Sequence, residues 1–206
     1  MSRSLNLIPK KNRMQKPLSW LMAMKVSLFV VLMVIMSGYK QQENLFFTDS
    51  GHVEFSSDAP LEYIQASSNE LAGILNINDL SFSFTVSMVS FQGFNSALQR
   101  THFNENYIES EKFPNSTFNG KIIEEIDFAS PGTYHIRAKG LLNVHGVDND
   151  KIIRCTIQVE TGRISVESSF TVPLDEHKIK IPSIVQQKIA EVIDVSIRFE
   201  MEPMNP

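Results

Sequence analysis

The feature that most limits how this chain can fold is a strict alternation of side chains between residues 80 and 88. Every second residue from Leu80 to Met88 is large and apolar, and serine or threonine fills the positions between. A period of two is typical of a β-strand with one buried and one exposed face. We therefore predict a half-buried strand here. Its inward residues are Phe82, Phe84, Val86 and Met88, and its solvent-facing residues are Ser81, Ser83, Thr85 and Ser87.

The same period recurs along most of the chain. It is clear over residues 134–144, 153–159, 164–172 and 195–201, and shorter candidates are residues 53–56, 61–66, 72–76 and 116–123. Turn-forming residues separate the candidates at 49–51, 130–132, 147–150 and 160–162. Helix is predicted only over residues 102–110 and 184–189. Eight or nine strands with one apolar face indicate an all-β antiparallel sandwich or barrel.

The first 38 residues differ in composition from the rest. They hold six of the 19 Lys and Arg residues and no acid, and the first acidic side chain is Glu43. The apolar run over residues 26–36 has about the length of a signal-peptide core and falls short of the roughly 20 residues that span a membrane. We expect residues 1–38 to be a signal peptide and residues 45–206 to form the β-domain. The exported protein would begin near Tyr39, in the periplasm or outside the cell.

Two alternatives stay open for this segment. If the apolar run is counted from Leu18, it is long enough to span a membrane, and the segment would be an uncleaved anchor. Lys25 would then lie inside the membrane at a cost of a few kcal/mol. In the other alternative, translation starts at Met24, and residues 24–38 are a shorter signal peptide.

The charge of the exported part excludes one class of partner. With six basic residues removed, 13 Lys and Arg remain against 23 Asp and Glu, a formal charge of −10. A domain this acidic repels phosphate backbones, so we expect no nucleic-acid binding. The single Cys155 cannot form an internal disulfide, and its alternation with Ile153 and Ile157 predicts a small core residue.

Residues that could support catalysis or metal binding are sparse. The five histidines are scattered without a His-x-x-x-His pair, so no metal site is predicted. Glu105, Glu109 and Glu111 fit a solvated acidic face, and no hydrolase, phosphate-loop or dinucleotide motif is present. We expect that the protein is not an enzyme. The alternative is an enzyme that uses His102 or His145 with a nearby carboxylate.

Four short motifs occur in order along the domain. They are His102-Phe103; Phe113-Pro114 followed by Phe118; Gly-Leu-Leu-Asn-Val-His-Gly-Val at 140–147; and Phe-Thr-Val-Pro-Leu-Asp-Glu-His-Lys-Ile at 170–179. Together they resemble the motifs of the YceI-like family of bacterial periplasmic proteins. The resemblance implies an eight-stranded lipocalin-like barrel with one or two short helices, whose apolar tunnel takes a polyisoprenoid such as an isoprenoid quinone. It implies no other cofactor. His177 stands where an aromatic residue is common in the family.

The alternating strands and the resemblance together predict a set of lumen residues. An eight-stranded barrel can hold one ligand, and the apolar lipid would be the partner; peripheral membrane contact and a homodimer are further interactions left open. The alternative is a barrel filled by its own aromatic side chains that acts as a non-enzymatic interaction module at the cell envelope. The predicted lumen residues are Phe82, Phe84, Val86, Met88, Phe103, Phe113, Phe118, Ile136, Leu142, Ile157 and Phe170.

Overall fold

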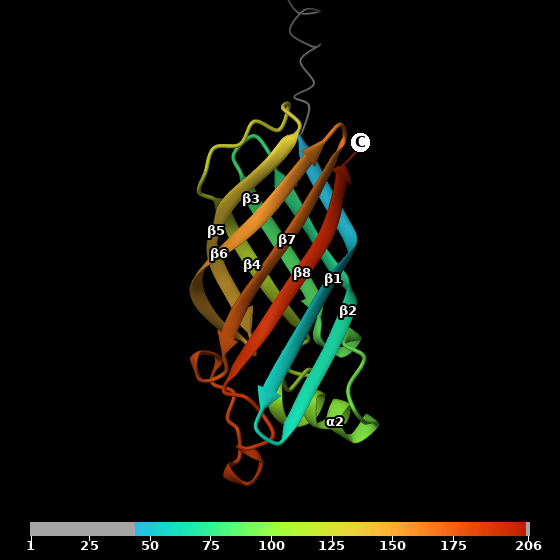
Figure 1. Cartoon of the computed structure of the whole chain (residues 1–206), viewed down its shortest axis with the longest axis vertical. Helices are drawn as coiled ribbons and strands as arrows, with labels where there is room; N and C mark the ends of the chain where they lie inside the picture. Colours follow the sequence, from blue (N-terminus) through green and yellow to red (C-terminus); the bar gives the residue numbers. More distant parts are fainter. Residues whose placement is uncertain (1–43, 205–206) are drawn as a thin grey trace, which may run out of the picture. The chain divides into compact units, whose positions relative to one another are not determined.

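The strands close into a single antiparallel barrel in the computed structural model, which describes residues 44–204 (Figure 1). Each strand pairs with the next along the chain, and β8 pairs with β1 to close the sheet. This confirms the predicted all-β, eight-stranded fold. The strands are β1 (Leu45–Ala59), β2 (Glu62–Asn76), β3 (Ser81–Ser87), β4 (Asn115–Ile122), β5 (Gly132–Val144), β6 (Val147–Glu160), β7 (Arg163–Pro173) and β8 (Val192–Pro203).

The alternation in β3 places its side chains as predicted. Phe82 and Val86 are buried and Phe84 is half-buried, whereas Ser83 and Thr85 are exposed and the terminal residues Ser81 and Ser87 are half-buried. The strand ends one residue earlier than the pattern suggested, because Met88 begins a short 3₁₀ turn, η1 (Met88–Ser90), although its side chain is still buried. The period of two therefore sorts this strand into an inner and an outer face.

The two ends of the barrel are built differently (Figure 1). The end that we call the turn end carries the connections at residues 77–80, 123–131 and 161–162. The other, the helical end, carries the long segments 88–114 and 174–191. These segments contain α2 (Ala97–His102), the π-helical turn η2 (Phe103–Tyr107) and the 3₁₀ turns η3 (Asp175–His177) and η4 (Ser183–Val185).

Two predicted turns are wrong. Residues 49–51 lie inside β1, where the register with β2 shifts between Thr48 and Val53, because a β-bulge accepts the same residue types as a turn. Residues 147–150 are the first residues of β6. The chain reverses at His145 and Gly146, as the glycine of the motif at 140–147 predicts, with φ angles of 53° and 69° that are those of a two-residue hairpin turn.

Other element boundaries also differ from the sequence-based expectation. Candidate strands 61–66 and 72–76 are parts of the one strand β2. The helix predicted at 102–110 begins earlier, at Ala97, because the Ser96 hydroxyl accepts a hydrogen bond from the Gln99 N–H and caps it. Of the helix predicted at 184–189, only the turn η4 forms.

The predicted signal peptide, residues 1–38, lies outside the described residues. Within residues 44–204, no helix is long and apolar enough to cross a membrane.

Candidate functional site

A cavity of about 530 Å³ lies inside the barrel, and inward-facing residues of all eight strands line it. Space remains partly because Gly120 and Gly140, which pair across β4 and β5, present no side chain to the interior. A Cβ atom on either glycine would come within 2.2 Å of backbone on the opposite strand, so the close approach of these strands requires glycine. The volume falls in the range of about 300–1,000 Å³ that is usual for small-molecule sites.

The structure places ten of the eleven predicted lumen residues in the cavity lining. Whether these ten contact a ligand stays a prediction. They are Phe82, Phe84, Val86, Met88, Phe103, Phe118, Ile136, Leu142, Ile157 and Phe170.

The predicted lumen position of Phe113 is wrong, since Phe113 is not among the described residues that line the cavity. Its ring packs edge-on against His145, with 4.7 Å between ring centroids, and covers Gly146. The cause is local, because Phe113 precedes β4 and meets the β5–β6 turn before the strand enters the barrel wall. Phe113 therefore fixes that turn.

One group of aromatic rings crosses the interior. Phe82 lies 5.0 Å from Phe118 on the neighbouring strand, measured between ring centroids, and Phe84 lies 4.8 Å from Phe199 on β8. Because β1 and β2 separate β3 from β8 in the sheet, the Phe84–Phe199 contact spans the lumen. These rings fill part of the barrel and also line the cavity beside them.

A second aromatic group attaches the segment 88–114 to the barrel. Phe55 of β1 stacks on Phe103, with 5.3 Å between centroids and 16° between ring planes. Phe91 and Phe94 lie against the same two rings. All four line the cavity at the helical end, so the position of α2 and η2 depends on apolar packing.

The cavity reaches the surface at the helical end. Lining residues there include Leu98, which is 63% exposed, and the exposed His102 and Lys188. At the turn end, Val159, Ile164 and Met201 are buried, each no more than 2% exposed. The opening therefore lies between α2 and the segment that follows η4.

Charged side chains in the described lining gather at that opening. They are Glu62, which accepts a hydrogen bond from Gln99 at 3.0 Å, and Lys188, with the titratable His102 beside them. Deeper in the lumen, burial raises the pKa of the Cys155 thiol and keeps it protonated at neutral pH. Within residues 44–204, no three His, Cys, Asp or Glu side chains group so as to hold a metal ion.

A histidine–carboxylate pair joins segments of the helical end. His145 Nε2 lies 2.7 Å from Glu109 Oε2, and its Nδ1 lies 3.1 Å from the carbonyl oxygen of His177. The hydrogen bond from His145 lowers the pKa of the Glu109 carboxyl. His145 and Glu109 both lie outside the set of described residues that line the cavity. Since both ring nitrogens of His145 face acceptors, the ring is held between three chain segments and does not point to the lumen.

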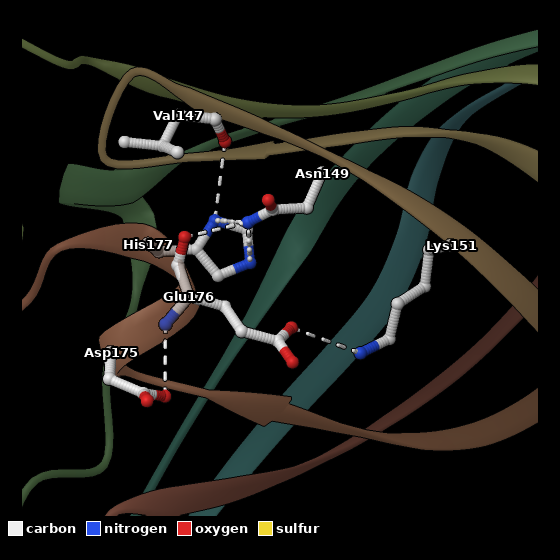
Figure 2. Close-up of polar contacts among 6 residues, drawn as sticks. All are labelled: Val147, Asn149, Lys151, Asp175, Glu176 and His177. Atoms are coloured by element: carbon white, nitrogen blue, oxygen red, sulfur yellow. Dashed lines mark hydrogen bonds and ion pairs between the residues drawn. The ribbon is translucent and has the colours of Figure 1, made fainter.

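The neighbouring His177 is the most deeply buried titratable side chain of this network (Figure 2). Its Nδ1 lies 3.2 Å from the carbonyl oxygen of Val147, and Asn149 Nδ2 donates to the carbonyl oxygen of Glu176 at 2.8 Å. Glu176 also forms an ion pair with Lys151 at 4.0 Å. Burial lowers the pKa of His177. Sequence analysis noted His177 only as a departure from the family pattern, and no periodicity could show its burial.

Solved structures share this fold at low sequence identity. A polyisoprenoid binding domain from Saccharophagus degradans implicated in plant cell wall breakdown matches with a TM-score of 0.67 at 12% identity, covering 78% of this chain and 99% of that one. BcnA of Burkholderia cenocepacia matches with a TM-score of 0.61 at 9% identity, covering 73% and 95%. The YCEI protein of Campylobacter jejuni matches with a TM-score of 0.52 at 17% identity, covering 66% and 81%.

No curated protein matches the chain. A family model does: the model of the YceI-like domain matches residues 42–201, which is nearly all of the barrel. The resemblance drawn from the four motifs is thereby confirmed, and this chain belongs to the YceI-like domain family.

Proposed function

We propose that the protein binds an apolar chain lipid of the polyisoprenoid type in its barrel and carries it, without catalysis, in the periplasm or outside the cell. The observation that carries the proposal is the cavity of about 530 Å³, apolar along its length and charged only at its open end. The similar Saccharophagus degradans domain is described as polyisoprenoid binding, which supports the same ligand class.

The proportions of the cavity favour a chain-like ligand. Five alternate residues of β8, from Ile193 to Met201, line it, and eight residue steps of a strand cover about 26 Å. Because the strands of a barrel tilt by about 35–45°, these steps cover roughly 20 Å along the barrel axis. A lining that is long and mostly apolar suits an extended hydrocarbon chain better than a compact polycyclic molecule.

Binding of this kind requires no reactive group. Affinity comes from apolar area removed from water, at roughly 25 cal/mol per Å² before the cost of ordering the chain. The closest approach to a catalytic pair is His145 with Glu109, and both ring nitrogens of His145 already face protein acceptors. These observations support a carrier over an enzyme.

The aromatic group that crosses the lumen favours a second candidate function. If Phe82, Phe84, Phe118 and Phe199 pack more tightly when the protein is free, the barrel fills itself and acts through its outer surface. The two functions differ in whether a lipid is retained. Extraction of the purified protein with organic solvent, followed by mass spectrometry, tests this directly.

Two adjacent leucines of β5 provide a matched pair of variants. Leu142 is buried and lines the cavity, whereas Leu141 faces solvent. We expect Leu142→Arg to lose the extracted lipid, because an unpaired charge in an apolar site is costly, and Leu141→Arg to keep it. Circular dichroism melting shows whether each variant is folded. A wild-type protein that never yields lipid, together with a Leu142→Arg variant that unfolds, would contradict the carrier function.

A further inference from the structure

We infer that the exposed apolar rim around the cavity opening docks on the surface of a phospholipid bilayer with zwitterionic headgroups, from which the chain lipid enters the barrel. The inference rests on the proposed function and adds the surface through which that function operates. The rim consists of Leu61, Tyr63, Val89, Leu98 and Ile184, all at the helical end.

The rim residues are large apolar side chains left in solvent. Ile184 is 89% exposed and Leu61 is 66% exposed, although isoleucine and leucine are usually buried. A scattered exposed leucine is normal, but a group of such residues around one opening marks a surface for an apolar partner.

Hydrogen bonds show that the rim residues lie on neighbouring segments. The Leu61 N–H donates to the carbonyl oxygen of Gln187 at 2.8 Å, which joins the β1–β2 turn to the segment after η4. Asn95 donates to the carbonyl oxygen of Tyr63 at 2.9 Å. Arg100 donates to the carbonyl oxygen of Val89, also at 2.9 Å. The rim is therefore one connected surface formed by three chain segments.

The rim continues into the lumen. Leu98 is exposed and also lines the cavity. Val185, which follows Ile184 in η4, and Ile189 line it as well. A lipid that leaves a bilayer at this surface would stay in contact with apolar side chains until it is inside the barrel. An opening that faced water would expose the chain during each transfer.

The charge of the rim fits a zwitterionic surface. The exported part of the protein has a formal charge of −10, whereas rim segments 60–63, 88–102 and 182–192 carry two acidic residues, Glu62 and Glu191, and two basic ones, Arg100 and Lys188. The acidic body would be repelled by anionic lipids. The neutral rim can approach a zwitterionic surface and insert its apolar side chains, as other interfacial surfaces do.

Partitioning of matched variants into phosphatidylcholine vesicles tests the docking. The rim variant is Leu61→Ser with Ile184→Ser, and its control is Leu141→Ser with Ile152→Ser, which removes two exposed apolar side chains from the outer wall. None of these four residues lines the cavity among the described residues. All proteins are isolated after export from the producing cell and carry the same N-terminus. We expect the rim variant to partition roughly tenfold or more weakly than wild type and the control to match wild type.

A site-specific readout complements the partitioning. The sequence has one tryptophan, Trp20, so Ile184→Trp adds a reporter at the rim and Ile152→Trp adds one on the wall, where the side chain is 56% exposed. We expect brominated phosphatidylcholine to quench the added fluorescence of Ile184→Trp and to leave that of Ile152→Trp unchanged.

The outcomes separate this inference from the proposed function. Equal partitioning of the rim and wall variants, with equal quenching of the two tryptophan variants, would overturn docking by the rim, while lipid extracted from the wild type would still support the carrier. Rim-specific docking by a protein that yields no lipid would support docking by the rim and contradict the carrier together with lipid entry at the rim. The Leu142→Arg variant should still dock, because its change lies inside the barrel.

Discussion

The two ends of the barrel are built from the same strands but differ in their connections and in the exposure of their apolar side chains. At the turn end, connections of two to nine residues join the strands, and Ile164 is only 1% exposed. At the helical end, segments 88–114 and 174–191 replace short turns, and Ile184 is 89% exposed. The comparison shows that alternating strands build the wall of the barrel, which the pairing of β8 with β1 closes. The opening requires long connections held by aromatic packing and by buried polar contacts.

The largest expected effect is a difference in unfolding free energy between alanine variants of one isoleucine at each end. Ile164→Ala should lower the free energy of unfolding by about 2–5 kcal/mol, because it leaves a cavity in a packed interior. Ile184→Ala should change it by no more than about 0.5 kcal/mol, since the side chain already lies in solvent. Urea denaturation of the two variants measures both values. Equal losses would show that the helical end is packed as tightly as the turn end.

A smaller difference in stability is expected between alanine variants of two glycines in hairpin turns. Gly162 at the turn end has a φ of 74° and, in the described part of the chain, no heavy atom within 4 Å of an added Cβ. Gly146 at the helical end has a φ of 69°, but there an added Cβ would meet the Phe113 ring. Gly162→Ala should cost about 1 kcal/mol for the left-handed backbone. Gly146→Ala should cost roughly 2–4 kcal/mol because it adds overpacking to the same strain.

The double variant Gly146→Ala with Phe113→Ala isolates the contribution of the ring. Relative to Phe113→Ala alone, the glycine change should then cost only what it costs at Gly162. Thermal melting of the four proteins completes the cycle. A Gly146→Ala penalty that stays the same without the Phe113 ring would contradict the proposed packing of Phe113 on the turn.

The wall of the barrel could be predicted from the sequence much better than its helical end. Side-chain alternation identified the inner face of β3 and placed Leu142 and Ile157 in the lumen, because a residue in a strand must face one side or the other. Family motifs added the closed eight-stranded topology, which periodicity alone could not distinguish from a sandwich.

The helical end lacked such a signal. Residues 147–150 have the composition of a turn, yet the left-handed φ angles fall on His145 and Gly146. Asp148 of β6 instead pairs with Asn143 of β5 and accepts a hydrogen bond from its side chain at 2.6 Å. Phe113 was assigned to the lumen because it is aromatic and near Phe118, but its direction is set by packing on a distant turn. Irregular segments take their conformation from such tertiary contacts, so single-sequence patterns do not determine it.

The smallest expected effect concerns how pH acts on the helical end through His177. Burial lowers the folded-state pKa of His177 below its ordinary value of 6.5. Between the lowered pKa and 6.5 the unfolded chain binds more protons at this residue than the folded chain does. The contribution that neutral His177 makes to the free energy of unfolding is therefore fully present above pH 6.5. It is lost as the pH falls from 6.5 toward the lowered pKa. No buried histidine acts in the same way at the turn end within residues 44–204.

Comparing wild type with His177→Gln across pH tests this contribution. Glutamine can still donate to the carbonyl oxygen of Val147, which His177 Nδ1 approaches at 3.2 Å, but it does not titrate. We expect the unfolding free energies to run parallel above pH 6.5, even if the variant is less stable, because neither protein exchanges protons at this site there. Below pH 6.5 the wild type should lose stability more steeply than the variant. The lowered pKa of Glu109 cannot produce this difference, since its contribution is lost only below the ordinary carboxyl value of 4.5 and is common to both proteins. If the unfolding free energies of the two proteins stay parallel down to pH 5, burial does not keep His177 neutral. Any sensitivity of the fold to acid would then arise outside the contacts that join η3 to β6.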